Sequence, residues 1–519
     1  MAEADKQTGG HPVESHLEDA PTPHLAADVN VYPGNGKYWW QVPSLLQLNL
    51  WLLVPLITSY VSGFDGSMLN GMQSLPVWQE DFNHPSGSIL GVVSTAQTIG
   101  GVVCLPLAPY LTDRFGRRFP ILLGSLTIIV GSAIQSGAMN IAMFIIGRIL
   151  VGTGGGLIAN SAAPLIAELA HPTQRPIITA IYNTSWYLGS IVAAWVTYGT
   201  FGLTNSWSWR IPSLLQALPS ILQFALIYFV PESPRWLVAN GRAEDAEKIL
   251  IEYHGGSDPS STLVMWEMAE ISAALETEKA QKDSSYMHFF KTAGNRHRFL
   301  ICFGLGFIIQ WCGNGLVSYY LVPVLNNIGI TNGETQNIIN GILQIFNYFT
   351  AIAAAFFVDK IGRRVLFMIS TVGMALSFVI WTAISARNEQ QNYENSGLGI
   401  GIVAMIFIFF FFYNIAMNPI PMAYILEVLP FTLRAKGITV FNFAQFSSSI
   451  FNGFVNPIAL EAIGWRYYIV FACLIPVWAV LIWLFFPETR GKRLEEVAVL
   501  FDGDDITQGV HDKIDKMTK

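Results

Sequence analysis

The sequence predicts an all-α membrane protein with twelve transmembrane helices in two six-helix bundles, joined by a helical linker. Three observations predict it. The 519 residues are 52% hydrophobic and only 13% charged, with a mean hydropathy of +0.42, which is too apolar for a soluble protein of this length. Twelve segments are long and apolar enough to span a bilayer. Short charged motifs of the first half also return in the same order in the second half.

The predicted spans each contain about 20 mostly apolar residues. Those of the first half begin near Leu46, Ser88, Phe119, Ile141, Ile177 and Ile211. Those of the second half begin near Phe299, Gln336, Val365, Leu398, Ala435 and Arg466. Because their number is even, both termini are expected on the same side of the membrane.

The distribution of Lys and Arg predicts which side that is. Basic motifs such as DRFGRR and DKIGRR follow even-numbered spans, whereas the opposite loops carry few cations. Since Lys and Arg accumulate in cytoplasmic loops, both termini are expected in the cytosol. Residues 1–43 have no apolar core of the kind found in a signal peptide and are predicted to form a disordered cytosolic tail. Residues 487–519 are predicted to form the second tail.

Residues 231–297 separate the two predicted bundles, which occupy residues 44–230 and 298–486. Apolar residues recur among charges at helical spacing in AEDAEKILIEYH and MWEMAEISAALETEKAQK, which predicts short amphipathic helices. A linker that braces the two halves is favoured over a separate catalytic domain.

Three motifs support a duplication of the six-span unit. The segment from Asp113 to Arg118 returns from Asp359 to Arg364, and PESPRW returns as PETRGK. The third motif is an acid followed seven residues later by an arginine, in the pairs Glu168 with Arg175 and Glu427 with Arg434. Parallel duplication of this kind predicts a binding site near the bilayer midplane, between halves that rock around it.

Asp65 is the only charged residue between Ser44 and Trp78. A charge at the centre of a spanning helix costs about 2.5 to 3.5 kcal/mol, so such residues are mostly functional. The only arginine well inside an early span is Arg148, near the small-residue face of Gly152 and Gly156. We therefore expect Asp65 and Arg148 to approach each other, with protonation of Asp65 controlled by their separation. A permanent structural ion pair is the alternative.

The motifs DRFGRR, GRILVGTGGG, PESPRWL and PETRGKRLEEV resemble the signatures of the sugar porter branch of the major facilitator superfamily, over the chain from Trp51 to Val497. Within that branch, YNTSWYLGSIVAAW and QWCGNGLVSYYL are similar to segments of fungal lactose and cellodextrin permeases. The resemblance implies proton coupling, because proton-coupled sugar porters carry an acid at the position of Asp65.

The repeated charged residues are expected to form two cytosolic salt-bridge clusters that favour the outward-open state when intact. The predicted members are Asp113, Arg117, Glu168, Arg175, Asp359, Arg363, Glu427 and Arg434. Exposed ion pairs contribute only about 0 to 1 kcal/mol each, so the clusters would bias a conformational switch without locking it. Topological anchoring by positive charge is the alternative interpretation.

Amides and aromatic rings inside apolar spans are the candidate sugar ligands, because amides bond to hydroxyl groups and rings stack on C–H faces. The candidates are Asn183, Trp186, Gln310, Asn314, Tyr319, Asn347 and Gln445. By resemblance, Gln310 matches one of the family's paired glutamines, Asn347 its eighth-span asparagine, and Gln445 a position that usually holds asparagine. A lone amide in a membrane helix serves equally often as a contact between helices.

The chain departs from the family pattern at three places. The amide after Gly313 is shifted by one position, Met422 replaces an expected tryptophan, and Leu165 replaces an expected tyrosine. Loss of the tryptophan removes a stacking surface and enlarges the site, which fits a disaccharide and also a non-sugar metabolite.

Together these features predict a proton-coupled importer of a disaccharide such as lactose or cellobiose, at the plasma membrane. The expected partners are the sugar, a proton and the lipid bilayer, with no cofactor, no metal and no nucleic acid. No phosphate-binding GxxxxGK[ST] loop and no His or Cys pair with metal-ligand spacing occurs. The alternatives are a transporter of a hexose or of a non-sugar metabolite, and a sugar sensor of the same fold. A sensor usually needs a longer tail than the roughly thirty residues that follow Pro487.

Overall fold

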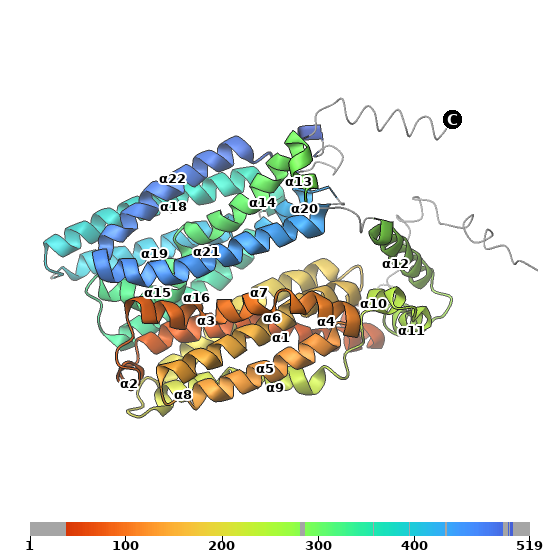
Figure 1. The fold of residues 1–519 in the computed structure, drawn as a ribbon, viewed down its shortest axis with the longest axis horizontal. Helices are drawn as coiled ribbons and strands as arrows, with labels where there is room; N and C mark the ends of the chain where they lie inside the picture. Colours follow the sequence, from red (N-terminus) through yellow and green to blue (C-terminus); the bar gives the residue numbers. More distant parts are fainter. Residues whose placement is uncertain are drawn as a thin grey trace, which may run out of the picture.

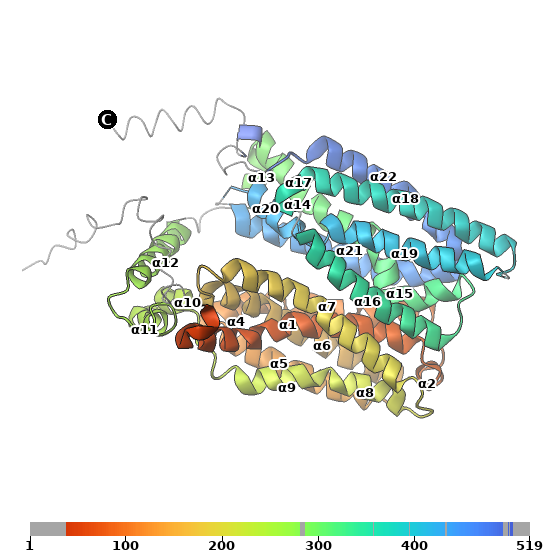
Figure 2. The same cartoon turned by 180° about the vertical axis from the view of Figure 1, so that it is seen from behind.

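The computed structural model describes residues 38–280, 286–355, 358–393, 395–430, 433–490, 497 and 499–501. The regular elements in these ranges are α-helices and short 3-10 helices. Figures 1 and 2 show two bundles of roughly parallel helices lying side by side, with the helices between them in sequence gathered at one end. The predicted all-helical fold class is confirmed.

The first bundle contains five long helices and several short ones. The long helices are α1 (Pro43–Gln73), α3 (Gly87–Cys104), α5 (Arg118–Ser136), α6 (Ile141–Leu169) and α7 (Arg175–Thr200). A sixth path across the bundle is divided into α8 (Trp207–Leu215) and α9 (Ala217–Leu226). The short elements are a 3-10 helix (Trp39–Gln41), α2 (Pro76–Asp81) and α4 (Leu107–Phe115).

Four helices follow in the linker, and they define what we call the linker end of the molecule. They are α10 (Pro234–Ala239), α11 (Ala243–Tyr253), α12 (Thr262–Ala280) and α13 (His288–Lys291). We call the opposite end, where α2 and α8 lie in Figure 1, the far end. The predicted N-terminal tail falls outside the described residues except for its last few positions, and the domain boundaries stay a prediction.

The second bundle repeats this plan with more breaks. Its helices are α14 (Ala293–Trp311), α15 (Asn314–Asn326), α16 (Gly333–Ala355), α17 (Val358–Ile361), α18 (Arg363–Gln390), α19 (Ser396–Ala416), α20 (Pro421–Val428), α21 (Arg434–Ile463) and α22 (Tyr468–Phe485), with a 3-10 helix at Gly464–Tyr467. The predicted seventh span is divided between α14 and α15 at Gly313, which has φ 95°. The predicted tenth span is divided between α19 and α20, where Pro419 and Pro421 interrupt the helical hydrogen bonding.

Eight helical stretches of the described chain are long and apolar enough to cross a membrane, and the last of them covers both α21 and α22. The predicted fifth, sixth and eighth spans are not among them. Helices α7 and α16 pack against each other between the bundles, where polar side chains are tolerated, and α8 and α9 are separated at Gln216. These eight stretches are consistent with the predicted twelve-helix fold.

Small residues bring α3 and α6 close together. A Cβ atom on Gly152 would clash with the Gln97 carbonyl, and one on Gly100 would clash with the Ile149 carbonyl. Both helices therefore depend on glycine where their backbones touch. This close approach places Arg148 of α6 beside the backbone of α3.

The two bundles meet along the far halves of several helices. Helix α3 packs against α21, α7 against α16, and α1 against α15 and α16. Ser86 donates a hydrogen bond to Glu461 over 3.2 Å, and the Asn337 amide donates to the Ser74 hydroxyl over 2.6 Å. The far end is therefore closed by contacts between the bundles.

Candidate functional site

Asp65 and Arg148 form a buried ion pair inside the first bundle. Arg148 Nη2 lies 2.9 Å from Asp65 Oδ2 and Nη1 lies 3.3 Å from Oδ1. The Asp65 side chain is 0% exposed and the Arg148 side chain is 1% exposed. The predicted approach of the two residues is therefore present, in the bidentate geometry that favours arginine over lysine.

Two further groups complete the surroundings of this pair. Gln216 Nε2 donates to Asp65 Oδ1 over 2.8 Å, and Arg148 Nε donates to the Val93 carbonyl over 2.8 Å. Gln216 reaches the pair because it stands at the break between α8 and α9. Both charges are thus paired and hydrogen-bonded, which is the condition for keeping ions away from water. Sequence reasoning missed Gln216, whose only signal is an amide within an apolar segment.

Two aromatic rings converge next to this pair. A Cβ atom on Gly66, the residue after Asp65, would lie 3.9 Å from Trp186 Cζ2 and 3.9 Å from Tyr319 Cε1. The two rings come from different bundles, and both were predicted as sugar ligands. Asn183 of α7, three residues before Trp186, was also predicted as a sugar ligand, and its side chain is exposed.

Two of the four predicted amides of the second bundle are already bonded to protein groups. Asn314 Nδ2 donates to the Tyr413 hydroxyl over 3.1 Å and its Oδ1 accepts from Ser318 over 2.7 Å. Asn347 Oδ1 accepts from Asn414 Nδ2 over 3.0 Å. Both side-chain groups of Asn314 and the Oδ1 of Asn347 are therefore engaged, and their bonds to Tyr413 and Asn414 join helices in this structure.

The other two amides, Gln310 and Gln445, have different surroundings. Both side chains are half-buried, and neither amide forms a hydrogen bond with the residues that the structure describes. Only the Gln310 backbone carbonyl is engaged, by Asn452 Nδ2 over 2.6 Å. These two side chains are therefore the ones free to bond to a ligand.

Substitution of Gln310 or Gln445 by Ala is expected to raise the KM for the transported solute by roughly threefold to tenfold, because each removes a hydrogen bond worth about 0.5 to 1.5 kcal/mol. Initial uptake rates measured over a range of concentrations test this. Asn388→Ala is the control, because this buried amide donates to the Ile328 carbonyl, away from the proposed ligand. An unchanged KM in both glutamine variants would remove them from the site.

Tyr187 links the bundles and was missed by sequence reasoning. Its hydroxyl donates to Asn414 Oδ1 over 2.7 Å and accepts from Asn418 Nδ2 over 2.7 Å. Asn414 follows the aromatic run Phe407 to Tyr413, and an amide at the end of so apolar a segment is the signal that could have found it. A polar network thus crosses from α7 to α19 near the predicted ligands.

Asn70 and Gln73 bind the backbone of α15 where this helix is irregular. Tyr320 has φ −133° and ψ 33°, which is not helical. Asn70 Nδ2 donates to the Ser318 carbonyl over 2.5 Å, and Asn70 Oδ1 accepts from the Leu321 N–H over 3.3 Å. Gln73 Nε2 donates to the Tyr319 carbonyl over 3.0 Å. These bonds satisfy backbone groups next to the irregular residue and close the far end beside the rings.

At the linker end, each bundle contains one of the predicted ion pairs. Arg117 is bidentate to Glu168, at 3.0 and 3.1 Å, and Arg363 bonds to Glu427 at 2.9 and 3.1 Å. Ser233 donates to Glu168, and Thr489 donates to Glu427. The structure therefore brings together the corresponding acid and base of each half, within a bundle rather than between bundles.

The remaining predicted members have other surroundings. Asp113 is exposed, and its backbone carbonyl accepts from Trp236 Nε1 over 2.8 Å. Arg434 Nε donates to the Leu429 carbonyl over 3.3 Å. None of the ion pairs observed between described residues includes Asp113 or Arg175, and the Asp359 side chain lies outside what the structure describes.

Two acids of the repeated PES and PET motifs, Glu232 and Glu488, complete these clusters. Glu232 accepts from the backbone N–H groups of Arg117 and Arg118, at 3.0 and 3.2 Å. Glu488 accepts from those of Arg363 and Arg364, at 2.9 and 3.1 Å. Each acid therefore caps the helix that follows a tight turn at glycine, Gly116 with φ 88° or Gly362 with φ 107°.

The linker is attached to the first bundle through a buried histidine. His254 Nδ1 lies 2.7 Å from Glu267 Oε2, and its Nε2 lies 3.0 Å from the Leu169 carbonyl at the end of α6. Both ring nitrogens face acceptors, so His254 joins Glu267 of α12 to the end of α6. His171 packs edge-on against it, with ring centroids 5.2 Å apart.

Burial, together with the nearby His254 and Arg175, lowers the pKa of His171 from 6.5 to about 3. Between these values the unfolded chain binds a proton at His171 and the folded protein does not, so stability falls as the pH is lowered from 6.5. We expect the Tm of the wild-type protein to be lower at pH 5 than at pH 7.5 by roughly 2 °C or more. The Tm of His171→Asn is expected to fall by less over the same range. Thermal unfolding of the purified protein measures the difference, and equal losses in both proteins would refute this assignment.

A family model described as "Sugar (and other) transporter" matches residues 51–501. "MFS-type transporter criB" of Aspergillus cristatus is 28% identical, over 86% of this chain and 91% of the relative. "Sugar transporter STL1" of Saccharomyces cerevisiae is 26% identical, over 85% and 78%. "Quinate permease" of Neurospora terricola is 28% identical, over 93% and 91%.

The fold also matches solved structures. The inward open conformation of the xylose transporter XylE from E. coli superposes with a TM-score of 0.73 at 24% identity, covering 88% of this chain and 100% of that one. The XylE complex with 6-bromo-6-deoxy-D-glucose gives 0.69 at 23% identity, covering 88% and 99%. Because the family model covers most of the sequence and the fold agrees with it, this chain belongs to the family of sugar and other transporters of the major facilitator superfamily, and is a transporter rather than an enzyme.

Proposed function

We propose that this protein imports a neutral sugar together with a proton, by alternating access of one site between the two bundles. The preferred substrate is a disaccharide such as lactose or cellobiose. The observation that carries the proposal is the buried Asp65–Arg148 pair, whose acid is adjacent in the chain to Gly66, where the rings of Trp186 and Tyr319 converge. A proton acceptor beside a ligand site is what coupling between the two requires.

The ligand chemistry supports a neutral, hydroxyl-rich substrate. Gln310 and Gln445 supply amides that have no hydrogen-bond partner in the described part of the chain, and the two rings supply stacking surfaces. The guanidinium of Arg148 is occupied by Asp65, so the pair offers no free cation to a carboxylate ligand.

The alternation is supported by how the bundles contact each other. Contacts between bundles close the far end, whereas the ion pairs Arg117–Glu168 and Arg363–Glu427 at the linker end lie within single bundles. We propose that the linker end is cytosolic, that both termini lie there, and that the protein resides in the plasma membrane. In this orientation the structure is closed to the outside. Both ion pairs are intact although the far end is closed, which differs from the expectation that intact clusters favour the outward-open state. We propose instead that they stiffen each bundle as it rocks.

Uptake measurements test the proposal. Radiolabelled lactose, cellobiose, glucose, xylose and quinate are offered to a yeast strain without sugar transporters that expresses this chain. The expected result is concentrative uptake of a disaccharide, with proton entry recorded as alkalinisation of a weakly buffered medium. Uptake of none of the sugars would refute the proposal.

A non-sugar polar metabolite is the second candidate. The quinate permease has the same 28% identity to this chain as the Aspergillus cristatus transporter. Met422, at the position of an expected tryptophan, is 42% exposed. Quinate uptake without sugar uptake in the same strain would establish this candidate in place of the first.

A further inference from the structure

A short helix at the linker end of the second bundle is separated from the helix before it. Helix α20 (Pro421–Val428) follows α19 after the break that contains Pro419 and Pro421. It carries Glu427, which pairs with Arg363 of α18. Because the two prolines have no N–H group to bond to α19, the position of α20 depends on contacts with other elements.

The chain after α22 binds one side of α20. The Tyr424 hydroxyl donates to the Pro487 carbonyl over 2.8 Å, and the Tyr424 ring stacks on that of Phe486 with centroids 5.5 Å apart. Glu427 accepts a hydrogen bond from the Thr489 hydroxyl over 2.6 Å. The chain after α22 therefore contacts α20 at two positions about one helical turn apart.

A buried arginine of α14 binds the end of α20. Arg298 is 1% exposed. Its Nε donates to the carbonyl of Val428, the last residue of α20, over 3.2 Å. Its Nη1 donates to Asn295 Oδ1 over 2.8 Å, within α14. Arg298 therefore joins the end of α20 to the first turns of α14.

Phe501 covers this arginine. The Cζ atom of Arg298 lies 4.7 Å from the centroid of the Phe501 ring, which is a cation–π contact. The ring of His297 lies 5.0 Å from the same ring, and His297 Nε2 lies 2.7 Å from the Phe485 carbonyl at the end of α22. Val497 is 2% exposed. The chain after α22 thus returns to α14 and packs on the side chain that binds α20.

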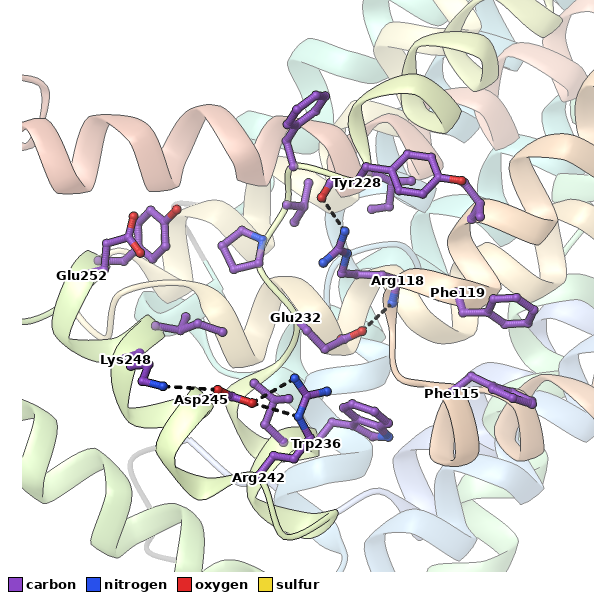
Figure 3. A pocket seen from close by; sticks show the side chains of 18 residues that line it. Phe115, Arg118, Phe119, Tyr228, Glu232, Trp236, Arg242, Asp245, Lys248 and Glu252 are labelled. Atoms are coloured by element: carbon purple, nitrogen blue, oxygen red, sulfur yellow. Dashed lines mark hydrogen bonds and ion pairs between the residues drawn. The ribbon is translucent and has the colours of Figure 1, made fainter.

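The first bundle provides an internal comparison. The end of α6 corresponds to α20 in the repeat, but α6 is continuous (Ile141–Leu169) and has Leu165 at the position of the α20 tyrosine. Figure 3 shows how the chain after α9 is attached at this end. Arg118 of α5 donates its backbone N–H to Glu232 and its guanidinium to the Tyr228 carbonyl. The end of α6 is held by its own helical hydrogen bonds, whereas α20 needs other partners.

We propose that Arg298 and Phe501 are positioning residues for transport, which hold α20 against α14 so that α20 moves together with the rest of the second bundle. Phe501 keeps the Arg298 guanidinium on the Val428 carbonyl by covering it. The contacts that do this lie within the second bundle and do not join it to the first. The positioning is the same whichever solute is transported, and it does not require proton coupling.

Hydrogen–deuterium exchange of the purified full-length protein, read by mass spectrometry, measures how often the backbone of α20 opens. Phe501→Leu keeps an apolar side chain without the ring and is expected to speed exchange in α20 about threefold. Phe501→Tyr keeps the ring and is expected to exchange like the wild type. Arg298→Gln also weakens the bond to Val428 and is expected to speed exchange about tenfold. In the uptake assay, Phe501→Leu is expected to lower kcat with an unchanged KM, because none of the predicted sugar ligands lies on α20.

Phe115→Leu is the matched control, because Phe115 lies at the linker end of the first bundle with Arg114 over its ring at 5.7 Å. It is expected to leave exchange in α20 unchanged. The end of α6 is the internal reference in every variant. Equal exchange in α20 of the wild type, Phe501→Leu and Arg298→Gln would overturn the positioning role, whatever solute the protein carries. Equal acceleration in α20 and α6 would overturn it too, because it would show a general loss of stability.

Discussion

Replacing Asp65 with Asn is expected to abolish uphill accumulation of the sugar and leave exchange across the membrane intact. An acid that carries one proton with each sugar lets 100 mV of membrane potential supply about 2.3 kcal/mol, enough for a roughly 50-fold gradient. Asparagine cannot release or bind this proton, so the expected ratio of internal to external sugar falls to about one. The alkalinisation that accompanies sugar entry disappears with it.

The measurement combines two readouts on the same cells. Steady-state accumulation reports coupling, whereas counterflow of labelled against unlabelled sugar reports the rocking of the bundles without a net proton. Both are normalised to the protein at the cell surface, because the variant also loses stability. Asp81→Asn is the matched control, since Asp81 is an exposed acid at the far end that accepts from Trp209 Nε1 over 2.8 Å. Accumulation by the Asp65 variant above the outside concentration would refute the proton role.

The pairing of Asp65 with Arg148 could be predicted because charges are so scarce in the spans. With one acid and one arginine inside the early helices, few partners had to be considered. Gln216 could not be identified in the same way, because amides are common and its position depends on the break between α8 and α9. Neither helix propensity nor the hydrophobic pattern of the sequence predicts where that break falls.

At the linker end, too, the sequence identified some of the residues that form the charged clusters and missed the role of others. Repetition of the motifs identified Arg117, Glu168, Arg363 and Glu427, which the structure pairs. The capping acids Glu232 and Glu488 were part of the same repeats, but their role depends on contact with backbone N–H groups more than a hundred residues away. Such contacts follow from how helices pack, which a single sequence does not specify.

The candidate ligands were predicted by residue type, and the structure separates them by their hydrogen bonds. The side chains of Asn314 and Asn347 are bonded within the protein, whereas the side-chain amides of Gln310 and Gln445 bond to none of the described residues. The sequence could not distinguish these cases, because both kinds of amide lie in equally apolar segments. Tyr187 was missed because its bonds to Asn414 and Asn418 join the two bundles, and the sequence does not show which helices of different bundles come into contact.

Replacing Asp65 and replacing Arg148 are expected to destabilise the folded protein by different amounts. Breaking a buried ion pair costs about 3 to 5 kcal/mol when a charge is left behind. In Arg148→Gln the remaining carboxylate can take up a proton and become neutral. In Asp65→Asn the remaining guanidinium cannot lose its charge. We therefore expect Asp65→Asn to lower Tm by roughly 6 °C or more and Arg148→Gln to lower it by less, as measured by thermal unfolding of the purified variants.

The double variant Asp65→Asn/Arg148→Gln decides whether the two residues act as a pair. It contains no buried charge, and its two amides can bond to each other, to Gln216 and to the Val93 carbonyl. Its Tm is therefore expected to recover most of what Asp65→Asn loses, which is a coupling of several kcal/mol in the double-mutant cycle. Additive losses of Tm would mean that the two charges do not stabilise each other. If the double variant regains stability and still cannot accumulate sugar, the pair is needed for proton coupling and not for folding, because a neutral site of the same shape holds the helices equally well.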